Sequence, residues 1–178
     1  MKPKTVGRDN SASGATTPAF SYGLMANSII LTLDGEKPVA DLRDGDRIVT
    51  RDAGMAVLRG VTCRKITCET VAIKAGSLGH TRPDSDVTLP AGHPILIRDW
   101  RAQALFNARQ AVVRADRLID DEFITAAGRQ TLTAYDLRFD RPHILYVDGL
   151  EVASEGQRPS SITPSDPPSR KTENAPLA

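Results

Sequence analysis

The residues best suited to chemistry are one histidine and a few hydroxyls near predicted turns. His93 lies in the corner Pro90–Pro94, and Thr88 lies five positions before it. Ser21 and Ser28 flank the start of the first apolar run. A histidine can donate or accept a proton in catalysis, and an activated hydroxyl can act as a nucleophile. These residue types suit general acid–base or nucleophilic catalysis, although proline and glycine alone would explain a corner in which His93 only makes a hydrogen bond.

The cysteines and the histidines predict neither a disulfide nor a metal site. If Cys63 and Cys68 share one strand, they lie about 16 Å apart on opposite faces, whereas a disulfide needs Cα atoms within about 7 Å. The histidines at 80, 93 and 143 add no spacing that would suit zinc. We therefore expect free thiols, no metal and no cofactor.

The charge balance argues against binding to nucleic acids or membranes. The net charge is +1, so the whole chain presents no basic field. The arginines between positions 98 and 117 are interleaved with aspartates. No apolar run approaches the roughly 18 residues of a spanning helix. No apolar stretch follows the basic residues at 2, 4 and 8, as it would in a secretory signal peptide.

Many short strands must position these residues. Asp-Gly pairs at 34–35 and 44–45 are strong turn signals. The predicted strands cover residues 28–33, 46–50, 57–61, 71–74, 87–89, 94–97, 122–125, 131–138 and 144–147. Two further segments, 100–107 and 113–119, are predicted to form single helical turns. Short strands at close spacing favour a compact all-β fold.

The two ends of the chain differ in composition from the middle. Residues 1–19 are small and polar, and the residues from 156 onward are rich in proline and serine. Neither end carries enough apolar surface to offset the entropy lost on ordering. We predict one domain over residues 20–155, a flexible tail at 1–19 and a disordered tail at 156–178.

Several segments, in the same order, resemble the Hint domain, which inteins share with the autoprocessing half of hedgehog proteins. The stretch 31–50, LTLDGEKPVADLRDGDRIVT, resembles its opening. Residues 71–79 and 89–97 resemble the segments around its central histidine, and 99–106, 112–118 and 135–149 resemble the later segments of bacterial Hint proteins. The resemblance implies a flat horseshoe of mostly antiparallel strands with two pseudo-twofold-related halves.

The resemblance also implies a chemistry and a place for each part of it. In this family a cysteine attacks the preceding peptide carbonyl, a histidine protonates the departing nitrogen, and a threonine three residues before the histidine orients the peptide. Counting back from the first Asp-Gly turn places Gly23 at the position of the cysteine. His93 falls at the position of the histidine, with Pro90 three residues before it. Thr88 would serve only if the corner bulges by two residues.

Two activities of the family are disfavoured by the same comparison. The match to the aspartate that helps activate a sterol in hedgehog-type members falls near residues 63–64, where no aspartate stands. Inteins close with an asparagine before the downstream splice junction, and residues 150–155 contain none. The sequence therefore argues against both sterol transfer and splicing.

Three hypotheses are consistent with these observations. The first is a degenerate Hint domain without autoproteolysis, which acts as a structural or binding module for an unknown protein partner or fused domain. The second is an active self-cleaving domain that uses a non-standard nucleophile such as Ser21. The third is a β-rich binding module outside the family. We expect a monomer that is cytoplasmic, or exported without a cleavable N-terminal signal.

Overall fold

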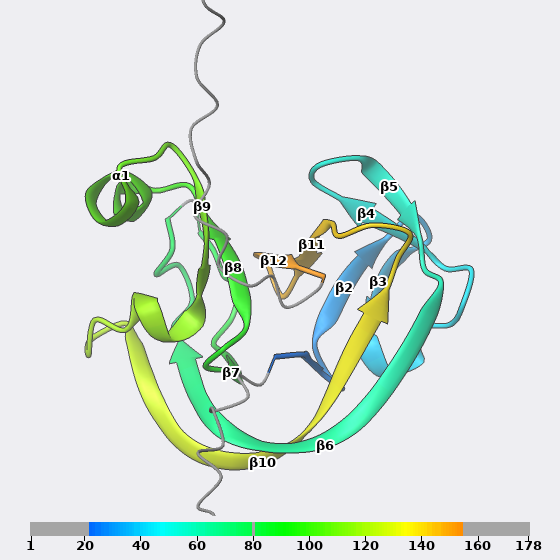
Figure 1. The fold of residues 1–178 in the computed structure, drawn as a ribbon, viewed down its shortest axis with the longest axis horizontal. Helices are drawn as coiled ribbons and strands as arrows, with labels where there is room; N and C mark the ends of the chain where they lie inside the picture. The colour runs from blue at the N-terminus through cyan, green and yellow to red at the C-terminus, as the bar shows by residue number, and fades with distance from the viewer. Residues whose placement is uncertain (1–21, 80, 155–178) are drawn as a thin grey trace, which may run out of the picture.

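Two antiparallel β-sheets form a horseshoe (Figure 1). The computed structural model describes residues 22–79 and 81–154, so the predicted tails, Ser21 and His80 lie outside the described residues. A 4-stranded sheet has the order β1-β10-β6-β7, and an 8-stranded sheet has the order β3-β2-β4-β11-β12-β8-β9, with β5 paired to β4. The all-β horseshoe expected from the sequence is confirmed.

The strands are β1 Leu24–Met25, β2 Ile29–Thr32, β3 Gly35–Pro38, β4 Arg47–Thr50, β5 Gly54–Val57, β6 Gly60–Ile73, β7 Val87–Pro90, β8 Pro94–Ile97, β9 Ala111–Arg114, β10 Ile124–Arg138, β11 Ile144–Val147 and β12 Leu150–Ala153. The helices are α1 Trp100–Phe106 and the 3-10 turns Val39–Asp41 and Ala115–Leu118.

A long curved ribbon of β6 and β10 connects the two halves of the horseshoe. The two strands pair continuously from Gly60 with Arg138 to Ile73 with Ile124, except for a register shift between Ala126 and Gly128. In Figure 1 this ribbon runs along the bottom of the molecule, with β2–β5 on one side and β7–β9 and α1 on the other. Both cysteines lie in β6, which is the extended arrangement on which the free-thiol prediction rested.

The hairpin of β11 and β12 closes the large sheet between these halves. β11 pairs with β2 and β4 on one side, and β12 pairs with β8 on the other. Its turn uses Asp148 and Gly149, both with positive φ, as a tight two-residue hairpin requires. The Asp148 carboxylate also accepts a hydrogen bond of 2.7 Å from the Ile29 amide. The turn is thereby tied to β2.

The strand predictions were correct where a turn signal stood close by and incomplete elsewhere. The predictions for 94–97 and 144–147 match β8 and β11 in full. The prediction for 57–61 was wrong, since residues 58 and 59 separate β5 from β6. The helical prediction for 113–119 was half wrong, because β9 ends at Arg114 and only a 3-10 turn follows. The strands predicted at 122–125 and 131–138 are one strand, β10, and β12 was not predicted.

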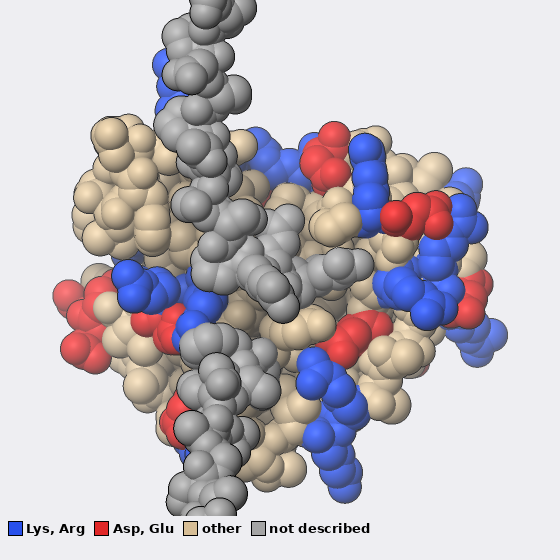
Figure 2. Space-filling model, in the orientation of Figure 1, with Lys and Arg blue, Asp and Glu red and all other residues tan. Residues whose placement is uncertain are grey.

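The core is built from aliphatic side chains, as an aromatic content of 4% requires. Its largest fully buried apolar side chains are Ile30, Ile48, Leu58, Ile73, Ile95, Ile124, Leu145, Val39 and Val71. The helix α1 leaves Trp100, Leu105 and Phe106 exposed. Figure 2 shows basic and acidic side chains interspersed on one face of the molecule. Among residues 22–79 and 81–154, none of the helices has the length and apolar character that a membrane crossing requires.

Candidate functional site

The corner between β7 and β8 turns His93 into the core. The His93 amide donates to the Pro90 carbonyl at 2.9 Å, and the Ala115 amide donates to the His93 carbonyl at 2.9 Å. These bonds close a tight turn over residues 90–93 and hold it against the chain that follows β9. The His93 residue is only 2% exposed. The corner therefore places an ionisable ring inside the horseshoe.

The His93 ring faces the backbone of Gly23. The Gly23 amide donates to His93 Nδ1 at 3.2 Å, across 70 positions of sequence. An Nδ1 that accepts carries no proton, so the neutral ring carries its proton on Nε2. Nε2 is buried and has no hydrogen-bond partner among the described residues. Burial lowers the pKa of His93 from 6.5 to about 4, so the ring is neutral at pH 7.

The other end of the same peptide bond is held by Arg64. Its guanidinium donates to the Tyr22 carbonyl oxygen at 3.2 Å and stacks 5.2 Å from the centre of the Tyr22 ring. Arg64 also donates to Asp136 Oδ2 at 2.8 Å, and this bond raises the pKa of the guanidinium. Asp136 Oδ1 is buried and has no partner among the described residues. The Tyr22–Gly23 peptide bond is thus hydrogen-bonded at both its carbonyl oxygen and its amide nitrogen.

This arrangement, which we term the peptide site, places a cation at the carbonyl oxygen and a histidine at the amide nitrogen of one peptide bond. A guanidinium on a carbonyl oxygen stabilises negative charge there, and a histidine on the amide nitrogen lies where a leaving group departs. Gly23 itself offers no attacking atom. Its φ is +133°, and a Cβ built on it would lie 2.7 Å from the Cβ of Ala134. No side chain fits at Gly23 without a shift of this backbone or of β10.

The structure brings two of the three site residues predicted from the sequence together. Gly23 and His93 are hydrogen-bonded, and both line a cavity of about 10 Å³ beside β1. Ser28, Val87 and Leu89 line the same cavity. Thr88 does not line it, because successive residues of a strand face opposite sides and Thr88 is exposed. A role for Thr88 or His93 in catalysis stays a prediction.

Sequence reasoning missed Arg64 and Asp136. They lie on neighbouring strands, since β6 and β10 pair Arg64 with Ala134 and Thr62 with Asp136. That register joins segments about 70 positions apart, and no local pattern specifies it. The remaining signal is the resemblance of residues 135–149 to the closing hairpin of the family, which points to the turn and not to the aspartate.

A second charged group lies on β12 and the loops around it. Glu151 is 3% exposed and receives hydrogen bonds from the guanidiniums of Arg51, Arg82 and Arg98. The Arg98 contact is bidentate, with distances of 2.8 and 3.0 Å. We term these four residues the arginine cluster. It ties the end of β4, the loop before β7 and the end of β8 to β12.

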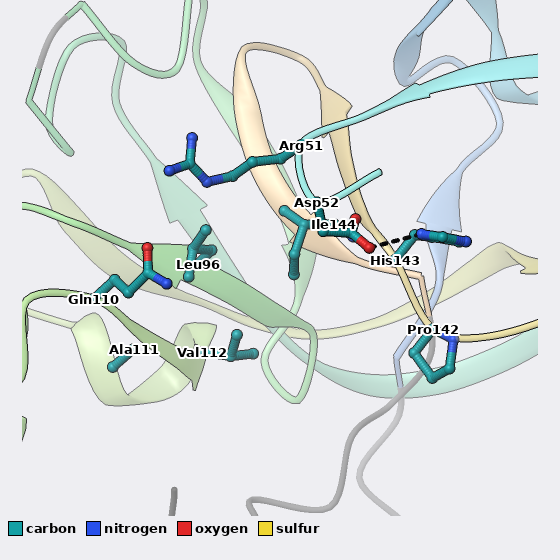
Figure 3. Close-up of a pocket in the computed structure, with 9 residues that line it drawn as sticks. All are labelled: Arg51, Asp52, Leu96, Gln110, Ala111, Val112, Pro142, His143 and Ile144. Carbon is teal, nitrogen blue, oxygen red and sulfur yellow. Dashed lines mark hydrogen bonds and ion pairs between the residues drawn. The ribbon is translucent and has the colours of Figure 1, made fainter. Parts of the chain in front are cut away.

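Next to the arginine cluster is an open pocket of about 520 Å³ between β4, β9 and β11. Figure 3 shows Arg51 and Gln110 on one side, and the hydrogen-bonded pair Asp52 and His143 on the other. Its remaining lining is apolar: Leu96, Ala111, Val112, Pro142 and Ile144. Burial would raise the pKa of Asp52, but hydrogen bonds from the Ile144 amide and from His143 outweigh it and lower that pKa.

The described residues hold no group of three or more His, Cys, Asp or Glu side chains that could bind a metal ion.

Comparison with known proteins identifies the fold and the family. The chain resembles a DnaB intein from Synechocystis sp. PCC 6803 with a TM-score of 0.54 at 16% identity, covering 76% of this chain and 99% of that one. An Ssp DnaB mini-intein variant gives 0.50 at 17%, over 74% and 93%. An intein-like domain from Clostridium thermocellum gives 0.49 at 15%, over 75% and 97%. No curated protein sequence matches.

The likeness to the two DnaB inteins concerns the fold alone, because the identities are low. A stronger link is the family model described as Hint domain, which matches residues 22–157. That match begins at Tyr22, one residue before the glycine that His93 contacts, and it covers most of the chain. The chain therefore belongs to the Hint domain family.

Proposed function

We propose that this Hint domain holds its Tyr22–Gly23 peptide bond without breaking it and acts as a structural or binding module. The observation that carries the proposal is the environment of Gly23. The residue has no attacking atom, its φ is +133°, and a Cβ there would meet the Cβ of Ala134 at 2.7 Å. Packing thus fills the place where the nucleophile of the family would project.

The protonation state of His93 supports the same proposal. Breaking an amide requires a proton on its nitrogen, but His93 receives a hydrogen bond from that nitrogen. To donate from Nδ1, the ring must carry a proton on that atom, either as the imidazolium or as the other neutral tautomer. With a pKa of about 4, roughly one ring in a thousand is doubly protonated at pH 7. His93 acts as an acceptor that holds the peptide in place.

A structural role follows from the elements that the hydrogen bonds to Gly23 and Tyr22 connect. Through Gly23, the start of β1 is bonded to the β7–β8 corner, and through Tyr22 it is bonded to β6. Residues 22–25 are thereby fixed to both sheets, since β1 and β6 lie in the small sheet and β8 in the large one. The peptide site connects the two layers of the domain.

A second candidate function is self-cleavage with a non-standard nucleophile. One observation favours it: both ends of a single peptide bond are held by groups that would assist its cleavage, with the unpartnered Asp136 Oδ1 close by. A Cβ on Gly23 would lie 3.4 Å from that oxygen. In this case Arg64 would stabilise the developing oxyanion.

The intact mass of the purified full-length chain distinguishes the two functions. We expect an unchanged mass after days at pH 7, with or without an added thiol. Release of a fragment that ends at Tyr22 would overturn the proposal. If that release is lost in Asp136→Asn and retained in Asp140→Asn, which alters an exposed carboxylate paired with Arg59, the carboxylate near Gly23 takes part in the cleavage.

A further inference from the structure

The pocket between β4, β9 and β11 has the composition of a ligand site. Small-molecule sites are typically concavities of about 300–1,000 Å³ with mostly apolar walls and a few polar groups. This pocket has a volume of about 520 Å³ and apolar walls from β8, β9 and β11. It shares no residue with the cavity beside His93. The pocket is therefore separate from the peptide site.

The charge next to this pocket is unbalanced. Three guanidiniums surround the single carboxylate of Glu151, so the arginine cluster carries two positive charges in excess. Arg82 Nε is buried and has no partner among the described residues. A buried carboxylate needs one guanidinium for neutrality. The surplus produces a positive potential on the side of the pocket where Arg51 lies.

Arg51 brings this potential to the pocket. Its side chain is 32% exposed and uses one nitrogen, 3.1 Å from Glu151 Oε1. The Glu151 contact fixes the orientation of the guanidinium, so little rotamer freedom is lost when a further acceptor binds. In Figure 3 the guanidinium of Arg51 and the amide of Gln110 lie on the same side of the pocket, with Leu96 nearby.

The opposite side of the pocket is acidic and already satisfied. Asp52 Oδ2 lies 2.8 Å from His143 Nδ1, and Asp52 Oδ1 accepts from the Ile144 amide at 2.9 Å. A ligand anion is repelled by this carboxylate and attracted by Arg51. These charges fix the orientation of a bound molecule, with its charged end at Arg51 and its apolar body against Leu96, Val112 and Ile144.

We propose that this pocket binds a small organic anion with an apolar chain, its carboxylate or phosphate head on Arg51 and Gln110. The site stands whether or not the domain cleaves itself, because none of its residues belongs to the peptide site. A neutral chain of the same length gains only the apolar contacts. A cation of that length has its charged end opposed by the arginine cluster.

The test is calorimetric titration of the full-length chain with octanoate, using 1-octanol and octylammonium as matched probes. We expect saturable binding of octanoate, at least about tenfold tighter than that of octanol, since a hydrogen bond to a charged group commonly contributes a factor of ten or more. Equal binding of octanol, tighter binding of octylammonium, or no saturable octanoate binding would overturn the proposal.

Substitutions at the pocket test whether octanoate binds there. Arg51→Gln should weaken octanoate binding about tenfold or more and leave octanol binding unchanged. Arg47→Gln removes an exposed charge that pairs with Asp34 and serves as the matched control. Because Arg51→Gln also removes a partner of Glu151, Val112→Trp provides a second variant, which fills the pocket and leaves the cluster intact. Octanoate binding that survives Val112→Trp would overturn the assignment.

Discussion

The peptide site and the pocket beside the arginine cluster differ in both space and charge. At the peptide site the free volume is about 10 Å³, and the central ionisable ring is neutral. The pocket has about 520 Å³ and is bordered by ionised groups that hold one another in place. The first region has hydrogen bonds directed at one peptide bond and little free volume, whereas the second has a large free volume beside an excess of positive charge. The hydrogen bonds to a peptide bond and the large open volume thus lie in separate regions of this domain.

The largest expected effect comes from restoring both the nucleophile and the space at the peptide site. Gly23→Cys combined with Ala134→Gly removes the 2.7 Å contact and supplies a thiol. With added thiol, this double variant should release the segment that precedes Gly23. Gel analysis of a reporter fused ahead of residue 1 measures the rate.

Its control is the triple variant that also carries His93→Ala. Loss of general acid catalysis should slow release by roughly 10²–10⁴-fold. Gly23→Cys alone should be slower than the double variant, because Ala134 opposes the new side chain. Equal rates with and without His93 would show that the histidine has no part in the chemistry.

In the second region, Glu151→Ala should be the most damaging single change. It leaves three guanidiniums around a buried position without their shared carboxylate, at a cost of roughly 3 kcal/mol in the free energy of unfolding. Urea denaturation measures it. The matched control is Asp140→Asn, which breaks the exposed pair with Arg59 and should leave the unfolding midpoint unchanged. An equally small effect for Glu151 would mean that the cluster adds no stability.

A pH titration of stability should distinguish the neutral histidine from the ionised groups. The folded pKa of His93 is about 4 and the unfolded value is 6.5, so the unfolded chain binds a proton more readily between these values. Stability is complete above pH 6.5 and is lost as the pH falls toward 4, by roughly 3 kcal/mol.

In His93→Asn this loss should be absent, because the amide oxygen replaces Nδ1 as acceptor without titrating. The lowered pKa of Asp52 acts in a different window, since its contribution is lost only below its unfolded value of 3.8. Stability curves of identical shape for the parent and the His93→Asn variant between pH 6.5 and 4 would refute the assignment.

The smallest expected effect measures the packing at Gly23. Gly23→Ala should destabilise the domain by about 1–3 kcal/mol more than Gly45→Ala. Gly45 also has a positive φ, of +93°, but a Cβ there would meet nothing within 4 Å. The two variants therefore share backbone strain and differ in the contact with Ala134. Equal destabilisation of the two variants in thermal unfolding would mean that β10 shifts at little cost and that Ala134 does not exclude a side chain at position 23.

The sequence predicted the elements with local signals and missed those that depend on distant partners. Asp34–Gly35 marked the hairpin of β2 and β3, and the corner before Pro94 marked His93. Counting from that first turn found Gly23, which the structure places against His93. Neither the continuity of β10 nor the contact of Arg64 with Tyr22 could be predicted, because both depend on the register between β6 and β10. The steric restriction at Gly23 could not be predicted either, since Ala134 lies over 100 positions away in the sequence.

The hairpin of β11 and β12 has a consequence for how the domain folds. It joins β2 and β4, from the first part of the chain, to β8, which comes much later in the sequence. During synthesis the two halves of the large sheet cannot join until Ala153 has left the ribosome. Until then the edges of the earlier strands stay unpaired, which favours a slow, late and cooperative closure of the sheet. A ribosome stalled before residue 144 would therefore carry the large sheet in two unjoined parts.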